Sequence, residues 1–258
     1  MHGGSGRSVT LELIADRFIW QLAKDEGLER VDSEPGAGLL ESIQYPGLTE
    51  PERERINGEV ANFYEHTTDY NFEVWSDWNP FFRPFAWLLN RIFSRCLQQL
   101  NLPLNPLDTA KGLRSRVIKL RDPVSRATRY PIWYRIIKGS GDVIYSGIYT
   151  ACAHPRYGHP LLKVIFPLPK GSASVVMDRS VEADGSLLQR SDGRYFGENG
   201  FYFTLTDGQG KWWAKFLRAM HEWIRVYEDG EGALRADHHL RFFGFRLMEL
   251  HYRLVRFR

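Results

Sequence analysis

The chain has 258 residues, 43% of them hydrophobic and 14% aromatic, which is enough to build the core of one large domain. Its net charge of only +3 excludes a strongly basic protein, and we expect no nucleic-acid partner. Two cysteines are too few for a disulfide framework, and no leader pattern opens the chain. We therefore predict a cytoplasmic protein with a single domain over residues 1–258, of which residues 1–9 are disordered.

Residues 10–110 are predicted to be mainly helical. A first helix starts at Thr10 and ends before Gly27, and a second starts at Thr49, where Glu52 completes a capping box. The second helix is expected to continue to about Thr68. This region is acidic, with 9 Lys and Arg against 17 Asp and Glu, whereas the remainder carries 25 against 14. The two parts either attract one another or leave a basic binding surface.

A third helix is expected over about residues 84–100, where apolar residues form a broad stripe. It has two interpretations. It packs on the sheet, or it lies on a membrane surface with Phe81, Phe82 and Trp87 at its start. Arginines within it exclude a comfortable membrane span.

Residues 111–258 are predicted to form a long antiparallel β-meander. The strongest signal is a hairpin whose arms, 128–138 and 143–152, flank a Gly-rich turn. Pairing Ile137 with Val143 places Tyr134 opposite Ser146. Further strands are expected at 70–78, 161–166, 172–181, 187–189 and 201–206, with a hairpin at 224–235. The spacing of Trp212, Trp213, Phe216, Leu217, Met220 and Trp223 predicts one inserted helix near 211–223.

Both faces of the central hairpin carry apolar side chains, so both need cover. The expected fold class is therefore α+β and β-rich: an antiparallel meander forming a barrel or a strongly curved sheet, covered by the N-terminal helices. Residues 238–257 fit a helix through Leu240, Phe243 and Leu247, and their first part also alternates as a strand does.

Three segments together resemble a known family. They are FAWLLNRIFSRCLQQLNLP, YPIWYRII and the closing VYEDGEGALRADHHLRFFGFRLMELHYRLVR. In this order the pattern resembles a bacterial family of unknown function that is sometimes found behind saccharopine-dehydrogenase-like reductase domains. The resemblance covers about residues 75–255 and implies that the closing segment is a strand, a tight turn and a final strand. It brings no established active site.

Known cofactor and nucleophile motifs are missing from the sequence. It has no nucleophile elbow, no His-Glu-x-x-His and no phosphate-binding loop, so we expect no cofactor. Cys152, His154 and His159 have metal-ligand chemistry, as do Asp237, His238, His239 and His251. However, adjacent His238 and His239 on a strand point to opposite faces, and we predict no metal site.

His238 is the candidate catalytic residue, because it shares a strand face with Leu234 and Leu240. A buried imidazole there either moves a proton or is only hydrogen-bonded within the core. Tyr134 is a second, more speculative catalytic candidate.

A ladder of apolar and hydroxyl side chains across the hairpin is the candidate ligand-binding site. Its predicted members are Tyr130, Ile132, Tyr134, Ser146, Ile148 and Thr150. Apolar walls with a few hydroxyls suit a bulky hydrophobic ligand. The alternative is a filled core whose tyrosine hydroxyls reach the surface.

These observations lead to three functional hypotheses. The first is binding of a hydrophobic small molecule such as a lipid, polyketide or isoprenoid. The second is a cofactor-free cyclase or isomerase acting on such a molecule, in which His238 or a tyrosine moves a proton. The third is a peripheral membrane protein that uses residues 81–100.

Overall fold

The computed structural model describes residues 18–32, 34–43, 47–82, 113–137, 143–168 and 171–257. Within these ranges a helical segment covers residues 18–25, followed by α2 (Glu50–Arg55), α3 (Gly58–Glu65) and the short 3₁₀ helix η1 (Thr67–Asp69). The predicted disorder of residues 1–9 and the predicted helix at 84–100 lie outside the described residues.

Most of the described chain is β-structure. The strands are β1 (Glu29–Val31), β2 (Tyr70–Trp78), β3 (Leu113–Arg121), β4 (Thr128–Ile137), β5 (Val143–Cys152), β6 (Leu161–Leu168), β7 (Gly171–Val181), β8 (Leu187–Ser191), β9 (Gly200–Thr206), β10 (Trp212–Phe216), β11 (Met220–Glu228), β12 (Leu234–Phe242) and β13 (Phe245–Arg256). The predicted β-rich antiparallel fold is confirmed, since every pairing among these strands is antiparallel.

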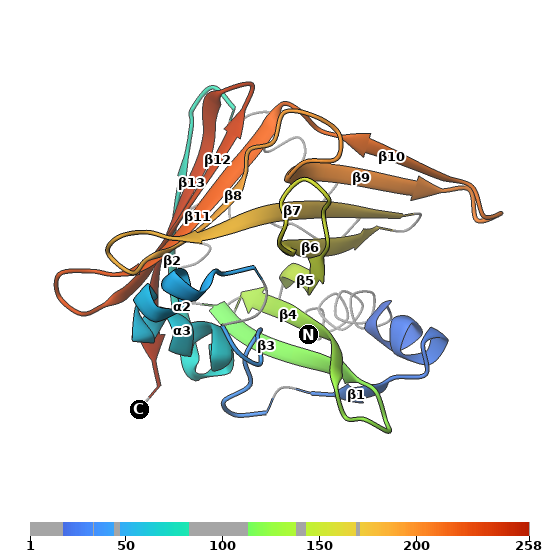
Figure 1. Ribbon diagram of the computed structural model, residues 1–258, viewed down its shortest axis with the longest axis horizontal. Helices are drawn as coiled ribbons and strands as arrows, with labels where there is room; N and C mark the ends of the chain where they lie inside the picture. Colours follow the sequence, from blue (N-terminus) through green and yellow to red (C-terminus); the bar gives the residue numbers. More distant parts are fainter. Residues whose placement is uncertain are drawn as a thin grey trace, which may run out of the picture.

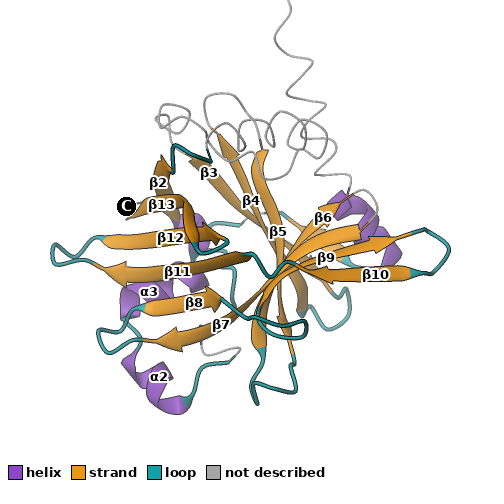
Figure 2. Ribbon diagram, turned by 90° about the horizontal axis from the view of Figure 1, so that it is seen from above, coloured by secondary structure: helices purple, strands orange, loops and turns teal. Residues whose placement is uncertain are grey.

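All these strands belong to one sheet, in the order β10-β9-β7-β6-β5-β4-β3-β2-β13-β12-β11-β8 with β1 beside β3 (Figure 1). The first half of β7 pairs with β9 and its second half with β8. β8 also pairs with β11, so the path of pairings turns back on itself. The two views show a strongly curved sheet with α2 and α3 on one side of it (Figures 1 and 2).

The sheet does not close into the barrel that we considered. Among the described residues, β2 and β3 share one register pair, Phe72 with Leu113, whereas β2 and β13 pair over nine residues. One residue pair does not make a continuous ladder between two strands. The strongly curved sheet is therefore the better description.

The predicted second helix begins where expected but is interrupted. Thr49 and Glu52 form the capping box, with the Thr49 amide donating to Glu52 at 2.8 Å. Ile56 and Asn57 then adopt extended backbone conformations, and the Asn57 side chain caps a new helix by accepting from the amides of Glu59 and Val60. An asparagine cap competes with helix continuation, which explains why one predicted helix is two.

The helix predicted near 211–223 is wrong. Trp212–Phe216 is strand β10 and Met220–Glu228 is strand β11. Four of the five residues of β10 are exposed, so this strand has neither a buried face nor the alternation that reveals one. Residues 238–257, for which helix and strand both remained open, form β12 and β13 around a turn at Phe243 and Gly244.

Three apolar clusters lie on the two faces of the sheet. The largest joins α3 to one face through Phe63, Phe72, Trp133, Leu187, Val226 and Leu234. We call this the inner face; it continues on β6 and β7 into a cluster of Leu162, Val164, Phe166, Val175 and Met177. On the outer face of β3 to β5, the helical segment 18–25 packs Ile19 and Ala23 onto the third cluster. Apolar side chains of the central hairpin thus belong to a packed cluster on each face of the sheet.

Candidate functional site

The predicted ligand-binding ladder lies on the outer face, beneath the helical segment 18–25. The register places Tyr134 opposite Ser146 and Ile132 opposite Ile148, as expected. The predicted pairing of Ile137 with Val143 is wrong, because a bulge after Arg135 pairs Val143 with Ile136. Ile132, Tyr134, Ser146 and Ile148 are buried, and Tyr134 is only 2% exposed. The structure brings these residues together as a packed layer.

The two remaining ladder members lie at the margin of that layer. Tyr130 is half-buried, and its hydroxyl donates to Glu26 at 2.9 Å. Burial and the neighbouring Glu26 carboxylate raise the pKa of Tyr130. The Thr150 hydroxyl donates to the carbonyl of Ala151 at 3.4 Å. The filled-core alternative thus describes the placement of this ladder better than a cavity wall does.

The inner face carries polar side chains between its two apolar clusters. The β7–β8 and β8–β11 registers place Arg179 beside Gln189 and Gln189 beside Ile224, and His238 follows on β12. Paired residues of an antiparallel sheet share a face, so Arg179, Gln189 and His238 form a polar band that Ile224 interrupts on β11. Apolar surface therefore flanks a few polar groups, which is the composition of small-molecule sites.

Arg179 is the least expected member of this band. Its side chain is 6% exposed, and within the described structure its Nε and Nη2 donate to no partner although both atoms are buried. Burial lowers the pKa of Arg179 to about 10, against the attraction of Tyr64, Glu52 and Asp178. The guanidinium nevertheless remains charged at neutral pH.

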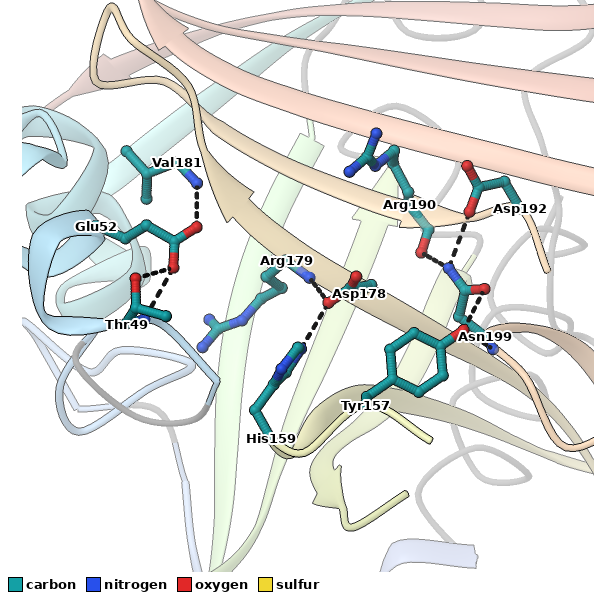
Figure 3. A network of polar contacts seen from close by, with 10 residues as sticks. All are labelled: Thr49, Glu52, Tyr157, His159, Asp178, Arg179, Val181, Arg190, Asp192 and Asn199. Atoms are coloured by element: carbon teal, nitrogen blue, oxygen red, sulfur yellow. Dashed lines mark hydrogen bonds and ion pairs between the residues drawn. The ribbon is translucent and has the colours of Figure 1, made fainter. Parts of the chain in front are cut away.

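The carboxylates nearest to Arg179 bind other groups (Figure 3). Glu52 accepts from the Thr49 hydroxyl at 2.7 Å and from the Val181 amide at 3.2 Å. Asp178 accepts from His159 Nε2 at 2.8 Å and from the backbone amide of Arg179 at 2.9 Å. Neither carboxylate forms an ion pair with the guanidinium itself.

Tyr64, from α3, closes the site on the helix side. Its hydroxyl accepts a hydrogen bond from Gln189 Nε2. Burial raises the pKa of Tyr64 to about 12, although the nearby charge of Arg179 lowers it. The neutral phenol and the amide of Gln189 thus face the buried cation without neutralising it.

A second arginine, Arg135 of β4, lies on the same face. Its guanidinium stacks 3.6 Å from the Trp133 ring centre and 4.7 Å from that of Phe72. Burial raises the pKa of Tyr252 on β13, against the charge of Arg135. Cation–π stacking lets an arginine remain charged in an aromatic environment.

His238 lies on the inner face with Leu234 and Leu240, as predicted. Its Nε2 lies 2.9 Å from a carboxylate oxygen of the buried Glu222, so a carboxylate, not a backbone group, satisfies the ring. Tyr134 lies on the opposite face of the sheet, within the outer-face cluster. The two predicted catalytic residues are therefore not brought together.

The other histidines pair with single carboxylates. His159 contacts Asp178, while on the outer face His239 contacts Glu249 and His251 contacts Asp237 at 2.7 Å. His238 and His239 point to opposite faces, as expected. Within the described ranges no three His, Cys, Asp or Glu side chains are grouped as metal ligands would be.

An open groove of about 510 Å³ crosses the outer face of β2, β13, β12 and β11. Its lining side chains are mainly charged or aromatic, and they include Trp75, Tyr227, Arg235, Asp237 and His251. The charged groups are already paired across strands, Arg235 with Asp229 and His251 with Asp237. The groove is open, and charged groups along it already neutralise one another. The polar band of the inner face differs, because it contains the Arg179 donors that have no partner in the described structure.

Sequence reasoning missed Arg179, Gln189 and Glu222. One signal was present for Arg179. On β7 it continues the alternation of Val175 and Met177, so it occupies a position whose neighbours on both sides are buried and apolar. A charged residue at such a position predicts a buried charge.

Comparisons with known proteins give one similar protein. The chain is 22% identical over 235 residues to a Bacillus subtilis (strain 168) protein described as "Uncharacterized membrane protein YndJ". The match covers 90% of this chain and 41% of that protein, so the chain spans less than half of the relative's length. No family model matches and no solved structure matches, so the family resemblance stays a prediction. Among the described residues, no helix is long and apolar enough to cross a membrane.

Proposed function

We propose that the protein binds a small amphiphilic molecule on the inner face of its curved sheet. The acidic end of the ligand pairs with Arg179, and its apolar body lies against the inner-face cluster of β6 and β7. The observation that carries this proposal is the buried Arg179 guanidinium, whose Nε and Nη2 donors find no partner among the described residues.

A buried charge without a counter-ion is costly, and buried polar groups normally find hydrogen-bond partners. The local carboxylates, Glu52 and Asp178, are engaged elsewhere. A carboxylate or phosphate on a ligand accepts two parallel N–H bonds from one guanidinium and would remove the penalty. Gln189 adds an amide beside it.

The apolar part of the ligand follows from the neighbouring side chains. Met177 and Val175 precede Arg179 on the same face of β7, and Val164 and Leu162 line it on β6. Apolar surface next to a single cationic anchor favours an acidic lipid-like molecule over a sugar or nucleotide. The relative's description as a membrane protein is compatible with a ligand derived from lipid.

The first experiment measures binding of two probes, oleate and 1-anilinonaphthalene-8-sulfonate, which both join an anion to an apolar body. The wild-type protein is expected to bind them, and Arg179→Gln is expected to raise both dissociation constants at least ~10-fold, because the charge-assisted pair is lost. Arg190→Gln is the matched control. It is exposed, and it lies on the opposite face of the neighbouring strand, in register with Asp178.

Two outcomes would overturn the proposal. One is a wild-type protein that binds neither probe and yields no bound molecule on organic extraction and mass spectrometry. The other is unchanged affinity in Arg179→Gln, provided that circular dichroism shows the variant is folded.

The contact of His238 with Glu222 favours a second candidate function, proton transfer to or from the bound molecule. An imidazole held by a buried carboxylate on the face of the ligand can accept and donate a proton. If it acts, the molecule extracted from wild-type protein will differ in structure from the one extracted from His238→Ala. Identical extracts would show that the protein binds the molecule without transforming it.

A further inference from the structure

The β9–β10 hairpin exposes large apolar side chains in the part of the chain that the structure describes. Trp212 is 63% exposed, Leu205 52% and Trp213 48%, and Phe203 is also exposed. β10 is the last strand in the sheet order, and its only partner in the described chain is β9. On its other edge β9 pairs with β7 from Gly200 to Leu205, and both views show the β9–β10 turn at the outer end of the hairpin (Figures 1 and 2).

Apolar side chains occupy both faces of this hairpin. Trp213 is in register with Leu205 and Lys215 with Phe203, so these four share one face. Trp212, in register with Thr206, lies on the other. A folded protein partner covers one face of a hairpin, whereas the interfacial layer of a membrane can take up exposed aromatic side chains from both faces.

The charges of the hairpin are mainly positive. The hairpin carries Lys211 and Lys215 and one acidic residue, Asp207. Asp207 accepts hydrogen bonds from the turn amides of Gln209 and Lys211. The Lys211 ammonium lies 5.1 Å from the Trp213 ring centre, so cation and aromatic ring are presented together. Tryptophan beside lysine is the composition of segments that lie at the headgroup level of anionic membranes.

We propose that the β9–β10 hairpin docks on an anionic membrane surface, with Trp212, Trp213 and Leu205 at the headgroup level and Lys211 and Lys215 facing acidic lipids. The alternative occupant is a second copy of the chain, paired through the free edge of β10. Lysine side chains on an edge strand oppose such pairing, which is why we favour the membrane. This inference does not depend on the proposed ligand.

The test is co-sedimentation with vesicles of phosphatidylcholine alone and of phosphatidylcholine with 30% phosphatidylserine. Wild-type protein should bind the mixed vesicles preferentially, and salt should weaken that binding. Trp212→Ala/Trp213→Ala should lower the partition coefficient at least ~10-fold, because two interfacial anchors are removed. Lys211→Glu/Lys215→Glu should abolish the preference for phosphatidylserine.

The matched control is Phe243→Ser/Phe245→Ser at the β12–β13 turn, where both phenylalanines are even more exposed. It removes as much exposed apolar surface from another site and should leave binding unchanged. Equal losses in the control and in the tryptophan variant would assign the effect to general hydrophobicity and overturn the proposal.

A local probe separates membrane docking from self-association. Gln209→Cys, in a background where Cys96 and Cys152 are serine, places an environment-sensitive fluorophore at the tip of the hairpin. A blue-shifted emission on mixed vesicles, with a monomer in analytical ultracentrifugation, is the expected result. A dimer that the tryptophan substitutions dissolve, without any vesicle-dependent shift, would show that the occupant is a second copy.

Discussion

At the scale of single residues, Arg179 and Tyr64 form the unusual feature of this protein. Burial moves both pKa values away from the usual range in the direction that favours the neutral group, to about 10 for the guanidinium and to about 12 for the phenol. Burial disfavours the charged form of both groups, the Arg179 cation and the Tyr64 anion, which indicates an environment with little water. Perturbed titratable groups of this kind gather at functional sites.

Tyr64→Phe should change the alkaline limit of stability. The phenol ionises near pH 10 in the unfolded chain but near 12 in the folded protein, so the stabilisation is complete below pH 10 and is lost as pH rises towards 12. The wild type is therefore expected to lose up to about 2–3 kcal/mol more than Tyr64→Phe across this window. Urea denaturation at a series of pH values measures the difference.

The lowered pKa of Arg179 is present in the wild type and in Tyr64→Phe. Its effect on the pH dependence of stability therefore largely cancels when the two are compared. At neutral pH the variant loses the acceptor of the Gln189 hydrogen bond, at a cost of about 1 kcal/mol. Parallel stability curves above pH 10 would contradict the burial of the Tyr64 hydroxyl.

At the scale of elements, the β9–β10 hairpin depends on the backbone of Gly200. This residue has φ +143°, and a Cβ added there would lie 2.5 Å from the Phe216 ring. It also pairs with Val176, which attaches the hairpin to β7. Only glycine combines that conformation with so close an approach.

Gly200→Ala should therefore destabilise the protein by about 1–3 kcal/mol, since backbone strain adds to the collision with Phe216. Gly230→Ala is the control. It lies in the β11–β12 turn without positive φ and with open space around its Cβ position, and it should be neutral within about 0.5 kcal/mol. Thermal unfolding of both variants gives the two melting temperatures. Equal values would show that the backbone at Gly200 can move enough to accept a Cβ.

The elements also show how far the sequence could lead. The capping box at Thr49 and the pairing of Tyr134 with Ser146 follow from local chemistry and were predictable. Strand β10 was not, because an exposed hairpin has no alternation and its tryptophans recur at helical spacing by chance.

The candidate site was predicted only in part. The sequence identified the doubly apolar hairpin of β4 and β5, but it could not say which face would be covered by the helical segment 18–25 and which would face the polar band. That choice depends on the curvature of the sheet, which brings Trp133 of β4 into one cluster with Val226 of β11. Such long-range contacts leave no local signal.

At the scale of the whole molecule, Phe72 joins the parts of the sheet at the junction of β2 and β3. It is in register with Leu113, its ring centre is 5.6 Å from that of Trp133, and the Arg135 guanidinium lies 4.7 Å from it. Phe63 of α3 packs against it from the helix side. Aromatic packing thus adds to the one described pair of β2 and β3 in holding these strands together.

Phe72→Ala should cost about 3–5 kcal/mol, whereas Phe72→Leu, which keeps most of the volume, should cost about 1–2 kcal/mol. Urea denaturation followed by circular dichroism and tryptophan fluorescence provides the measurement. If the alanine variant lost less than about 1 kcal/mol, the two parts of the sheet would have to be held together elsewhere.

The pairing of β2 with β13 has a consequence for how this chain folds during its synthesis. Within the described residues, the long ladder of β2 is the one with β13, in which even the nearest paired positions are Trp78 and Met248. A ribosome delivers β13 long after β2 has emerged, so the edge of β2 that pairs with β13 stays unpaired while ten other strands are made. Because β2 and β13 are far apart in the sequence, their pairing is slow to form. We therefore expect the nascent chain to fold slowly and to need chaperones.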